Sequence, residues 1–174
     1  MPLDKTEILK SELLDFPGEL SKELGRKITL IAVGGTAMTL LGLKPSTRYI
    51  DFTIPSSDFP EYKMAEKNIP HGYKIDVYSD GCIFSQNLPD DYLDDSIEIA
   101  NLEHISLRAL HPLDIVVTKI GRLDDRDLED IEECIKAYGL EKEQIKNRAA
   151  NVTYIGKQEH YDYNLKCVLE KFFH

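Results

Sequence analysis

One stretch of the chain combines apolar residues, glycines and a threonine in an order that suits anion binding. A β-branched apolar run, Ile28–Val33, is followed at once by Gly34, Gly35 and Thr36, and then by apolar residues at helical spacing. This order predicts a buried strand, a glycine turn and the start of a helix. The first amides of a helix have no acceptor within the helix, and its dipole favours negative charge at that end.

Two later segments place carboxylates at strand-like spacing. Tyr49–Ile54 is expected to be a strand, and alternation puts Tyr49 and Asp51 on one of its faces. Tyr73–Tyr78 is expected to be another, with Asp76 on the face opposite its apolar residues. Taken alone, each acid has an ordinary explanation as a polar residue near a turn or on the exposed side of a strand.

A cationic segment and an acidic segment follow one another after His111. Lys119 and Arg122 are three residues apart, so both are expected to project from one face of a helix. The next helix carries Asp127 and Asp130. Judged from the helices alone, these charges form a solvated face on which the cations pair with the acids.

Apolar periodicity and turn residues predict the remaining elements. Helices are expected at Asp4–Leu14, from Pro17 to Leu24, from Thr36, at Asp58–Asn68, from His111 to Leu123, and at Asp125–Tyr138, Leu140–Arg148 and Gln158–Phe173. Strands are also expected at Ser96–Ala100 and Ser106–Leu110, and Leu88–Asp95 is expected to be a loop. Residues 1–174 should form a single domain, with an α/β core over 1–111 and a helical part over 112–174 packed on it. Periodicity alone supports an α/β or α+β fold.

The bulk composition sets limits on function. The chain has 174 residues and a formal net charge of −10, which argues against a broad surface for duplex nucleic acid but allows a local basic pocket. No apolar run is long enough to cross a membrane and the N-terminus lacks a signal-peptide layout, so we expect a cytoplasmic protein without a membrane partner. The three cysteines are isolated and are expected to be reduced thiols.

The motifs together resemble a known superfamily. Gly-Gly-Thr-Ala at 34–37, followed by Thr-Arg-x-Ile-Asp-Phe at 47–52, resembles the minimal nucleotidyltransferases, which have the DNA-polymerase-β-like fold. With Lys-x-x-Arg at 119–122 and Arg-Asp-x-x-Asp at 126–130, the sequence looks most similar to AbiEii-type proteins, over residues 28–131. The resemblance implies a small, mixed, twisted sheet flanked by helices and followed by a helical C-terminal part.

The resemblance also implies roles for individual residues. Asp51 and Asp76 would hold Mg²⁺, and Gly34, Gly35 and Thr36 would cradle the triphosphate. Lys119 would contact the phosphates, with Arg122 beside it and Asp127 as an acid from the next helix. Arg48 would either clamp a phosphate or pair with a local acid. The family has a carboxylate where this chain has Tyr49, and a tyrosine hydroxyl is a poor magnesium ligand.

Three functional hypotheses follow. The first is a magnesium-dependent transferase that moves a nucleotidyl group from a nucleoside triphosphate to an RNA end such as that of tRNA, a protein hydroxyl or a small alcohol. Such a protein could be a toxin with a cognate antitoxin as partner. The second, favoured by Tyr49, is a non-catalytic member of the same fold that binds a nucleotide or a protein partner. The third is an acidic interaction protein without a nucleotide site.

Overall fold

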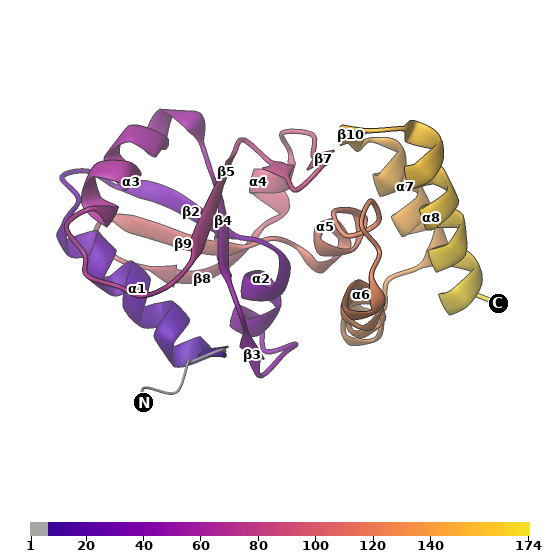
Figure 1. Ribbon diagram of the computed structural model, residues 1–174, viewed down its shortest axis with the longest axis horizontal. Helices are drawn as coiled ribbons and strands as arrows, with labels where there is room; N and C mark the ends of the chain where they lie inside the picture. The colour runs from indigo at the N-terminus through magenta and orange to yellow at the C-terminus, as the bar shows by residue number, and fades with distance from the viewer. Residues whose placement is uncertain (1–6) are drawn as a thin grey trace.

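The computed structural model describes residues 7–174, and a five-stranded mixed sheet forms its core (Figure 1). Its strands are β2 (Ile28–Ala32), β4 (Ile50–Ile54), β5 (Ile75–Ser79), β8 (Ile97–Asn101) and β9 (Ile105–Ala109). They lie in the order β5-β4-β2-β9-β8. β4 runs parallel to β5, and β2 runs parallel to β9, whereas the β2–β4 and β8–β9 pairs are antiparallel. The prediction of a small mixed sheet flanked by helices is therefore confirmed.

The N-terminal helix differs from its prediction. A two-residue strand, β1 (Ile8–Leu9), pairs with β3 (Ser46–Thr47), and α1 (Lys10–Lys22) then continues without interruption. The predicted break at Pro17 is wrong. An internal proline costs a helix roughly 3 kcal/mol, but the Pro17 side chain is buried with three apolar neighbours of α1, and this burial offsets the cost. The start of the helix predicted at Asp4–Leu14 lies outside the described residues.

Two short helices connect the central strands. α2 (Gly34–Leu40) follows β2 directly, as the glycine turn predicts, although the helix begins at Gly34 rather than Thr36. After β4, a 3₁₀ turn, η1 (Ser56–Asp58), leads into α3 (Phe59–Glu66), which makes the crossover to β5. These connections place the start of α2 and the strands β4 and β5 in one region of the molecule.

A second, small sheet joins the two parts of the chain. β6 (Cys82–Ile83) and β7 (Gln86–Asn87) form a hairpin, and β10 (Thr153–Tyr154) from the C-terminal part pairs with β7. Strands of two residues have no detectable period, so the sequence did not predict them. The predicted loop at Leu88–Asp95 is wrong in its second half, where α4 (Tyr92–Asp95) forms a helical turn anchored by the buried Tyr92 ring.

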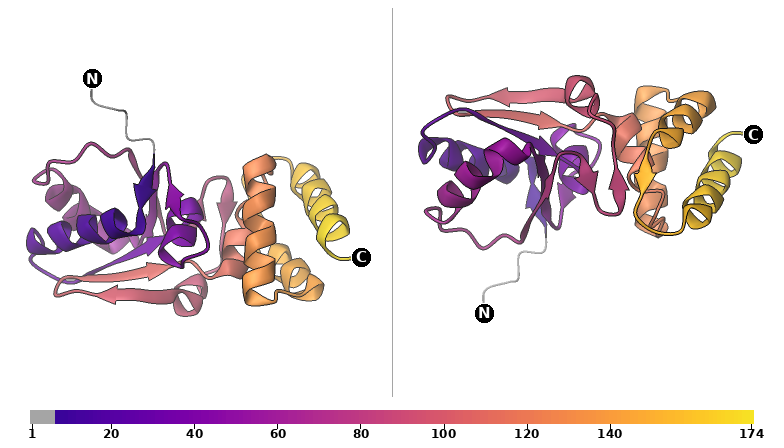
Figure 2. Two further views of the ribbon diagram at one scale, coloured as in Figure 1. Left: turned by 90° about the horizontal axis from the view of Figure 1, so that it is seen from below. Right: turned by 90° about the horizontal axis from the view of Figure 1, so that it is seen from above.

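The C-terminal part is helical, with α5 (Pro112–Val117), α6 (Asp125–Tyr138), α7 (Lys142–Ala150) and α8 (Gln158–Phe172). It lies beyond one end of the main sheet, with α8 on the outside (Figures 1 and 2). α6 ends at Gly139, whose φ of 59° is the left-handed conformation expected at a helix C-terminus. The predicted extension of α5 to Leu123 is wrong, since residues 118–122 form turns and Leu123 has a φ of 49°.

Arg148 joins two helices of the C-terminal part by a buried ion pair and also contacts an acid of the α/β part. The Arg148 guanidinium of α7 donates to both carboxylate oxygens of Asp114 on α5, at 2.5 and 3.1 Å, and to Asp91 beside α4 at 2.9 Å. Burial raises the pKa of Asp114 and Arg148 opposes that effect. One cluster of buried apolar residues extends from Ile8 to Leu169. Within residues 7–174, the helices are all too short or too polar to cross a membrane.

Candidate active site

The acids Asp51 and Asp76 are neighbours across two parallel strands. They are register partners on β4 and β5, so their side chains leave the sheet on the same face. Both line a cavity of about 530 Å³. Burial, followed by the charge of Asp76, raises the pKa of Asp51 to about 6, and the cations Lys119, Arg122 and Lys74 only partly oppose this. The cavity wall therefore carries a buried carboxylate that the nearby cations do not fully stabilise.

Thr36 holds the Asp51 strand in place. Its hydroxyl donates to the carbonyl of Tyr49 and accepts from the amide of Asp51, both at 2.9 Å. The Thr36 side chain is fully buried and is not part of the cavity wall. The hydroxyl is thus committed to β4, and the predicted place of Thr36 in a phosphate cradle stays a prediction that concerns its backbone amide.

The glycine turn fits closely against the neighbouring strand. Gly35 lines the cavity, and a Cβ there would lie 2.8 Å from Thr47 Oγ1, so any other residue would require Thr47 to shift. Gly34 has a φ of +53°, a conformation that glycine adopts at little cost, and it lies outside the cavity wall. Of the predicted cradle, only Gly35 borders the space beside the acid pair.

Lys119 and Arg122 converge on Asp127, but from a turn rather than from one helix face. Lys119 Nζ lies 3.2 Å from Asp127 and 3.0 Å from Asp130, and its side chain is only 4% exposed. Arg122 donates two hydrogen bonds of 2.8 Å to Asp127. Burial opposes ionisation of Asp127, yet Arg122 and Lys119 outweigh it and lower its pKa to about 2. Asp127 also closes a capping box with Asp124 at the start of α6.

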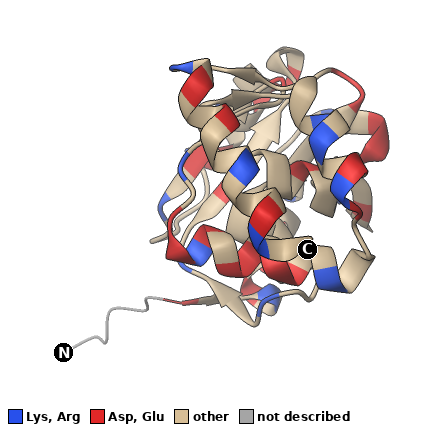
Figure 3. Cartoon of the chain, turned by 90° about the vertical axis from the view of Figure 1, so that its right-hand side faces the viewer, with Lys and Arg blue, Asp and Glu red and all other residues tan. Residues whose placement is uncertain are grey.

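The remaining cations around the cavity are more accessible. Arg48 is exposed on the cavity wall, and among residues 7–174 its guanidinium has no acidic partner. Both alternatives for Arg48, a phosphate contact and an ion pair with a local acid, stay predictions. Tyr49 is 49% exposed at the same wall, and the ammonium of Lys74 lies 5.5 Å from its ring centroid. Figure 3 shows Lys and Arg interspersed with Asp and Glu over the C-terminal helices.

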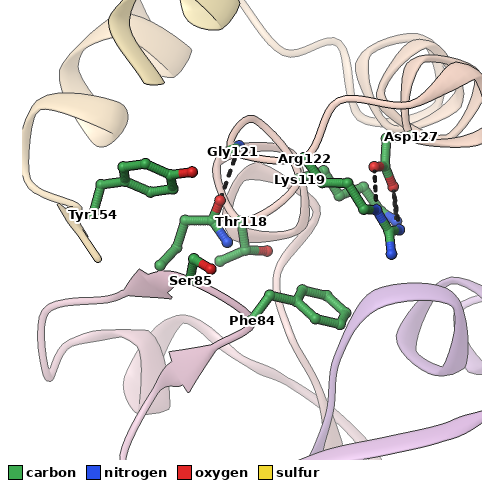
Figure 4. A pocket seen from close by; sticks show the side chains of 9 residues that line it. Phe84, Ser85, Thr118, Lys119, Gly121, Arg122, Asp127 and Tyr154 are labelled. Atoms are coloured by element: carbon green, nitrogen blue, oxygen red, sulfur yellow. Dashed lines mark hydrogen bonds and ion pairs between the residues drawn. The ribbon is translucent and has the colours of Figure 1, made fainter. Parts of the chain in front are cut away.

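A second cavity of about 310 Å³ adjoins the first and was not predicted (Figure 4). Both cavities include Phe84, Lys119, Arg122 and Asp127 in their walls. The smaller one is completed by residues of the β6–β7 hairpin, of the turn after α5 and of β10, namely Ser85, Gln86, Thr118, Gly121 and Tyr154. Phe84, at the tip of the hairpin, belongs to no recognisable sequence motif, so it could not be predicted as a site residue from the sequence.

The number and type of side chains at the acid pair limit which metal ion could bind there. Within the part of the chain that the structure describes, no group of three or more His, Cys, Asp or Glu side chains could hold a metal ion. All three cysteines are free thiols. Asp51 and Asp76 alone fit a single Mg²⁺, because that ion commonly binds one or two carboxylates and completes its shell with water and substrate phosphates.

The mixed sheet, the glycine turn that leads into α2 and the acid pair on adjacent strands define a nucleotidyltransferase-like α/β protein. The family described as "Nucleotidyltransferase of unknown function (DUF6036)" matches residues 12–174, and the chain belongs to this family. A comparison with curated proteins finds no match. The superfamily expected from the sequence motifs is therefore confirmed at this level.

Proposed function

We propose that this protein transfers a nucleotidyl group from a nucleoside triphosphate to a hydroxyl acceptor. The observation that carries the proposal is the register pairing of Asp51 with Asp76 on one cavity wall, in a chain of a nucleotidyltransferase family. The raised pKa of Asp51 supports it, because a bound cation would stabilise a carboxylate whose charge burial disfavours. In the transfer, the acceptor oxygen bonds to the α-phosphorus, the bond to pyrophosphate breaks and the acceptor proton passes to solvent.

Asp51 and Asp76 would hold Mg²⁺, which when bound would neutralise charge on the triphosphate. Arg48 would contact the phosphates directly, since its guanidinium is exposed on the same cavity wall. Arg122 is the second candidate contact, because its side chain is 59% exposed although it is bonded to Asp127. The amide of Gly35 would add a backbone donor at the turn.

Lys119 and Asp127 would act as positioning residues in this scheme. Asp130 shares the Lys119 ammonium with Asp127, so a phosphate would have to compete with two carboxylates for it. The same contacts hold the turn that carries Arg122 against the start of α6. We therefore assign two roles to Lys119. Its charge attracts the bound anion from a distance, and its ion pairs keep the turn that carries Arg122 in place.

The narrower resemblance to AbiEii-type proteins suggests the acceptor and the biological role. The acceptor would be an RNA end, a protein hydroxyl or a small alcohol, and a toxin role would require a cognate antitoxin as partner. The net charge of −10 disfavours extended contacts with the phosphate backbone of a long nucleic acid. It therefore favours acceptors that contact the protein only within the cavity. Growth arrest on expression of the wild type, but not of Asp51→Asn, would support a toxin role.

The transfer reaction can be tested with four α-³²P-labelled triphosphates, Mg²⁺ and three acceptor classes: total tRNA, a cell protein extract and glycerol. We expect pyrophosphate release and label transfer by the wild type, and loss of both in Asp51→Asn and Asp76→Asn. Glu98→Gln is the matched control, because Glu98 is an exposed carboxylate on the opposite edge strand, β8. Equal transfer by the wild type and Asp51→Asn would contradict the proposal.

A second candidate is a non-catalytic protein that binds a nucleotide. Tyr49 favours it, because the phenol stands on the cavity wall where the superfamily has a carboxylate. Tyr49→Asp discriminates between the two candidates. Transfer that is found only in the variant would identify the natural chain as the non-catalytic form, and transfer by the wild type would exclude that reading.

A further inference from the structure

Phe84 occupies a backbone position that its residue type disfavours. It is the first of two residues, Phe84 and Ser85, that connect β6 to β7 in a tight hairpin, and its φ is 53°. Two-residue hairpin turns favour asparagine, aspartate or glycine where φ is positive, since a side chain there is strained by about 1 kcal/mol or more. A phenylalanine at this position, 36% exposed, suggests that the ring itself is required there.

The ring is held at the boundary between the two cavities. A Cβ on Gly34 would lie 3.6 Å from Phe84 Cζ, so the ring edge rests close to the glycine turn. The Tyr78 ring meets it edge-on with centroids 5.6 Å apart, and the Arg122 guanidinium lies 5.5 Å from its centroid. These contacts fix Phe84 between the acid pair and the smaller cavity, in both of whose walls it takes part.

The smaller cavity has a rigid wall beside this ring. Gln86 is buried and fully engaged, since its amide donates to the Ile83 carbonyl and its oxygen accepts from the Gly121 amide. A Cβ on Gly121 would lie 2.5 Å from Tyr154 Cε1, so only glycine allows this close approach. The hairpin, the turn after α5 and β10 are thereby held in contact. The wall of the cavity between them is therefore made of groups that neighbouring residues hold in place.

We infer that the smaller cavity receives the base of the nucleoside triphosphate and that the base stacks on Phe84. This inference rests on the proposed function, which places the phosphates beside Asp51 and Asp76. A nucleobase is a flat ring with a polar edge, and here an aromatic ring, a guanidinium, the Ser85 hydroxyl and the Tyr154 phenol border one space. Stacking on an aromatic side chain is available to every base, so Phe84 would favour nucleotides over bare phosphate chains with little base preference.

The inference is tested by titrating the protein calorimetrically with ATP and with inorganic tripolyphosphate, each in the presence of Mg²⁺. Tripolyphosphate carries the phosphates without a base. We expect the wild type to bind ATP about tenfold more tightly than tripolyphosphate, a factor within the usual range for stacking of one base. Phe84→Ala should lose that advantage for ATP and leave the tripolyphosphate affinity unchanged.

Three further variants separate stacking from folding. Phe84→Asn suits a positive φ, and this relief offsets part of the packing lost with the ring, so the variant should fold and still lose the preference for ATP. Phe84→Tyr keeps the ring and should retain that preference. Tyr163→Ala removes an aromatic ring that is 67% exposed and lines neither cavity, and it should change neither affinity.

The outcomes distinguish this inference from the proposed function. Binding of tripolyphosphate together with an ATP affinity that is no higher, or that Phe84→Ala and Phe84→Asn leave unchanged, would overturn the base site alone. Failure of the wild type to bind either compound would overturn the triphosphate site and the base site together.

Discussion

The two charged walls of the larger cavity differ in how their charges are compensated. On the sheet wall, Asp51 and Asp76 are register partners, and burial together with mutual repulsion raises the pKa of Asp51 to about 6. On the helical wall, Asp127 is bonded to Lys119 and Arg122, and its pKa falls to about 2. The pKa values of two aspartates thus shift in opposite directions on the two walls.

This difference indicates which charged groups are available to a ligand. The helical wall satisfies its own charges, and its ion pairs fix the turn between α5 and α6. The sheet wall retains negative charge that no contact within the described chain fully neutralises. A bound cation would stabilise the Asp51 carboxylate of the sheet wall, whereas Lys119 of the helical wall would lose its contacts with Asp127 and Asp130 by engaging a ligand. Single substitutions on either wall test this contrast.

The largest effect is expected from Lys119→Met. This change leaves Asp127 and Asp130 buried without the ammonium between them, and loss of one partner of a buried ion pair costs about 3–5 kcal/mol of unfolding free energy. Urea unfolding followed by circular dichroism measures the cost. Lys136→Met is the matched control, because Lys136 makes an exposed pair with Glu132 whose loss should cost less than about 0.5 kcal/mol. A cost below about 1 kcal/mol for Lys119→Met would contradict the view that Lys119 compensates the buried charges of Asp127 and Asp130.

Asp51→Asn should stabilise the protein at neutral pH, whereas Lys119→Met should destabilise it. Because the folded chain holds the Asp51 proton more tightly than the unfolded chain, this group's contribution to stability decreases as pH rises from about 4 to about 6. At pH 8 the variant should therefore be more stable than the wild type by about 3 kcal/mol, and the gap should close as pH falls from about 6 to about 4. Urea unfolding across this pH range measures the gap.

The control for this change is Asp94→Asn, an exposed acid on α4, which should show no such pH-dependent gap. Added Mg²⁺ should stabilise the wild type at pH 8 and leave Asp51→Asn unaffected. A wild type that is as stable as Asp51→Asn throughout the range would argue that the sheet wall carries no excess charge.

Tyr49→Asp should sharpen the contrast by adding a third carboxylate to the sheet wall. We expect Mg²⁺ to bind the variant about tenfold more tightly, an improvement of about 1.4 kcal/mol, as measured by isothermal titration. Tyr49→Phe removes only the hydroxyl and should bind Mg²⁺ like the wild type. Equal affinities for Tyr49→Asp and Tyr49→Phe would mean that residue 49 does not face the ion.

The smallest effect is expected from Lys74→Ala. Lys74 is exposed and is one of the cations that lower the pKa of Asp51. Its removal should raise that pKa slightly and change the unfolding free energy by less than about 0.5 kcal/mol. A carboxyl NMR titration of the variant checks both the sign and the modest size of the shift, and a fall in the Asp51 pKa would be contrary to expectation.

Much of the sheet wall could be predicted from the sequence, because its signals are local. The apolar run before Gly34 and the alternation around Asp51 and Asp76 each depend on neighbours in the chain, and β2, α2, β4 and β5 formed where those patterns indicated. The family match supports the class of protein inferred from the motifs, and the roles of single residues stay predictions.

The contacts that could not be predicted join residues distant in sequence. No local pattern tells that the Thr36 hydroxyl bonds to β4, or that β10 pairs with a two-residue strand. The spacing of Lys119 and Arg122 suggested a shared helix face, whereas the helix ends at Val117 and both side chains reach Asp127 from a turn. There the tertiary ion pairs, and not the helical period, determine the position of the side chains.

The most direct test of the contrast between the walls is a ¹³C-detected NMR titration of the Asp51 carboxyl group in the wild-type protein, without and with Mg²⁺. We predict a pKa of about 6 without the ion, and a clearly lower value when the ion is present. A pKa near 3.8, the ordinary value, that does not respond to Mg²⁺ would contradict the account.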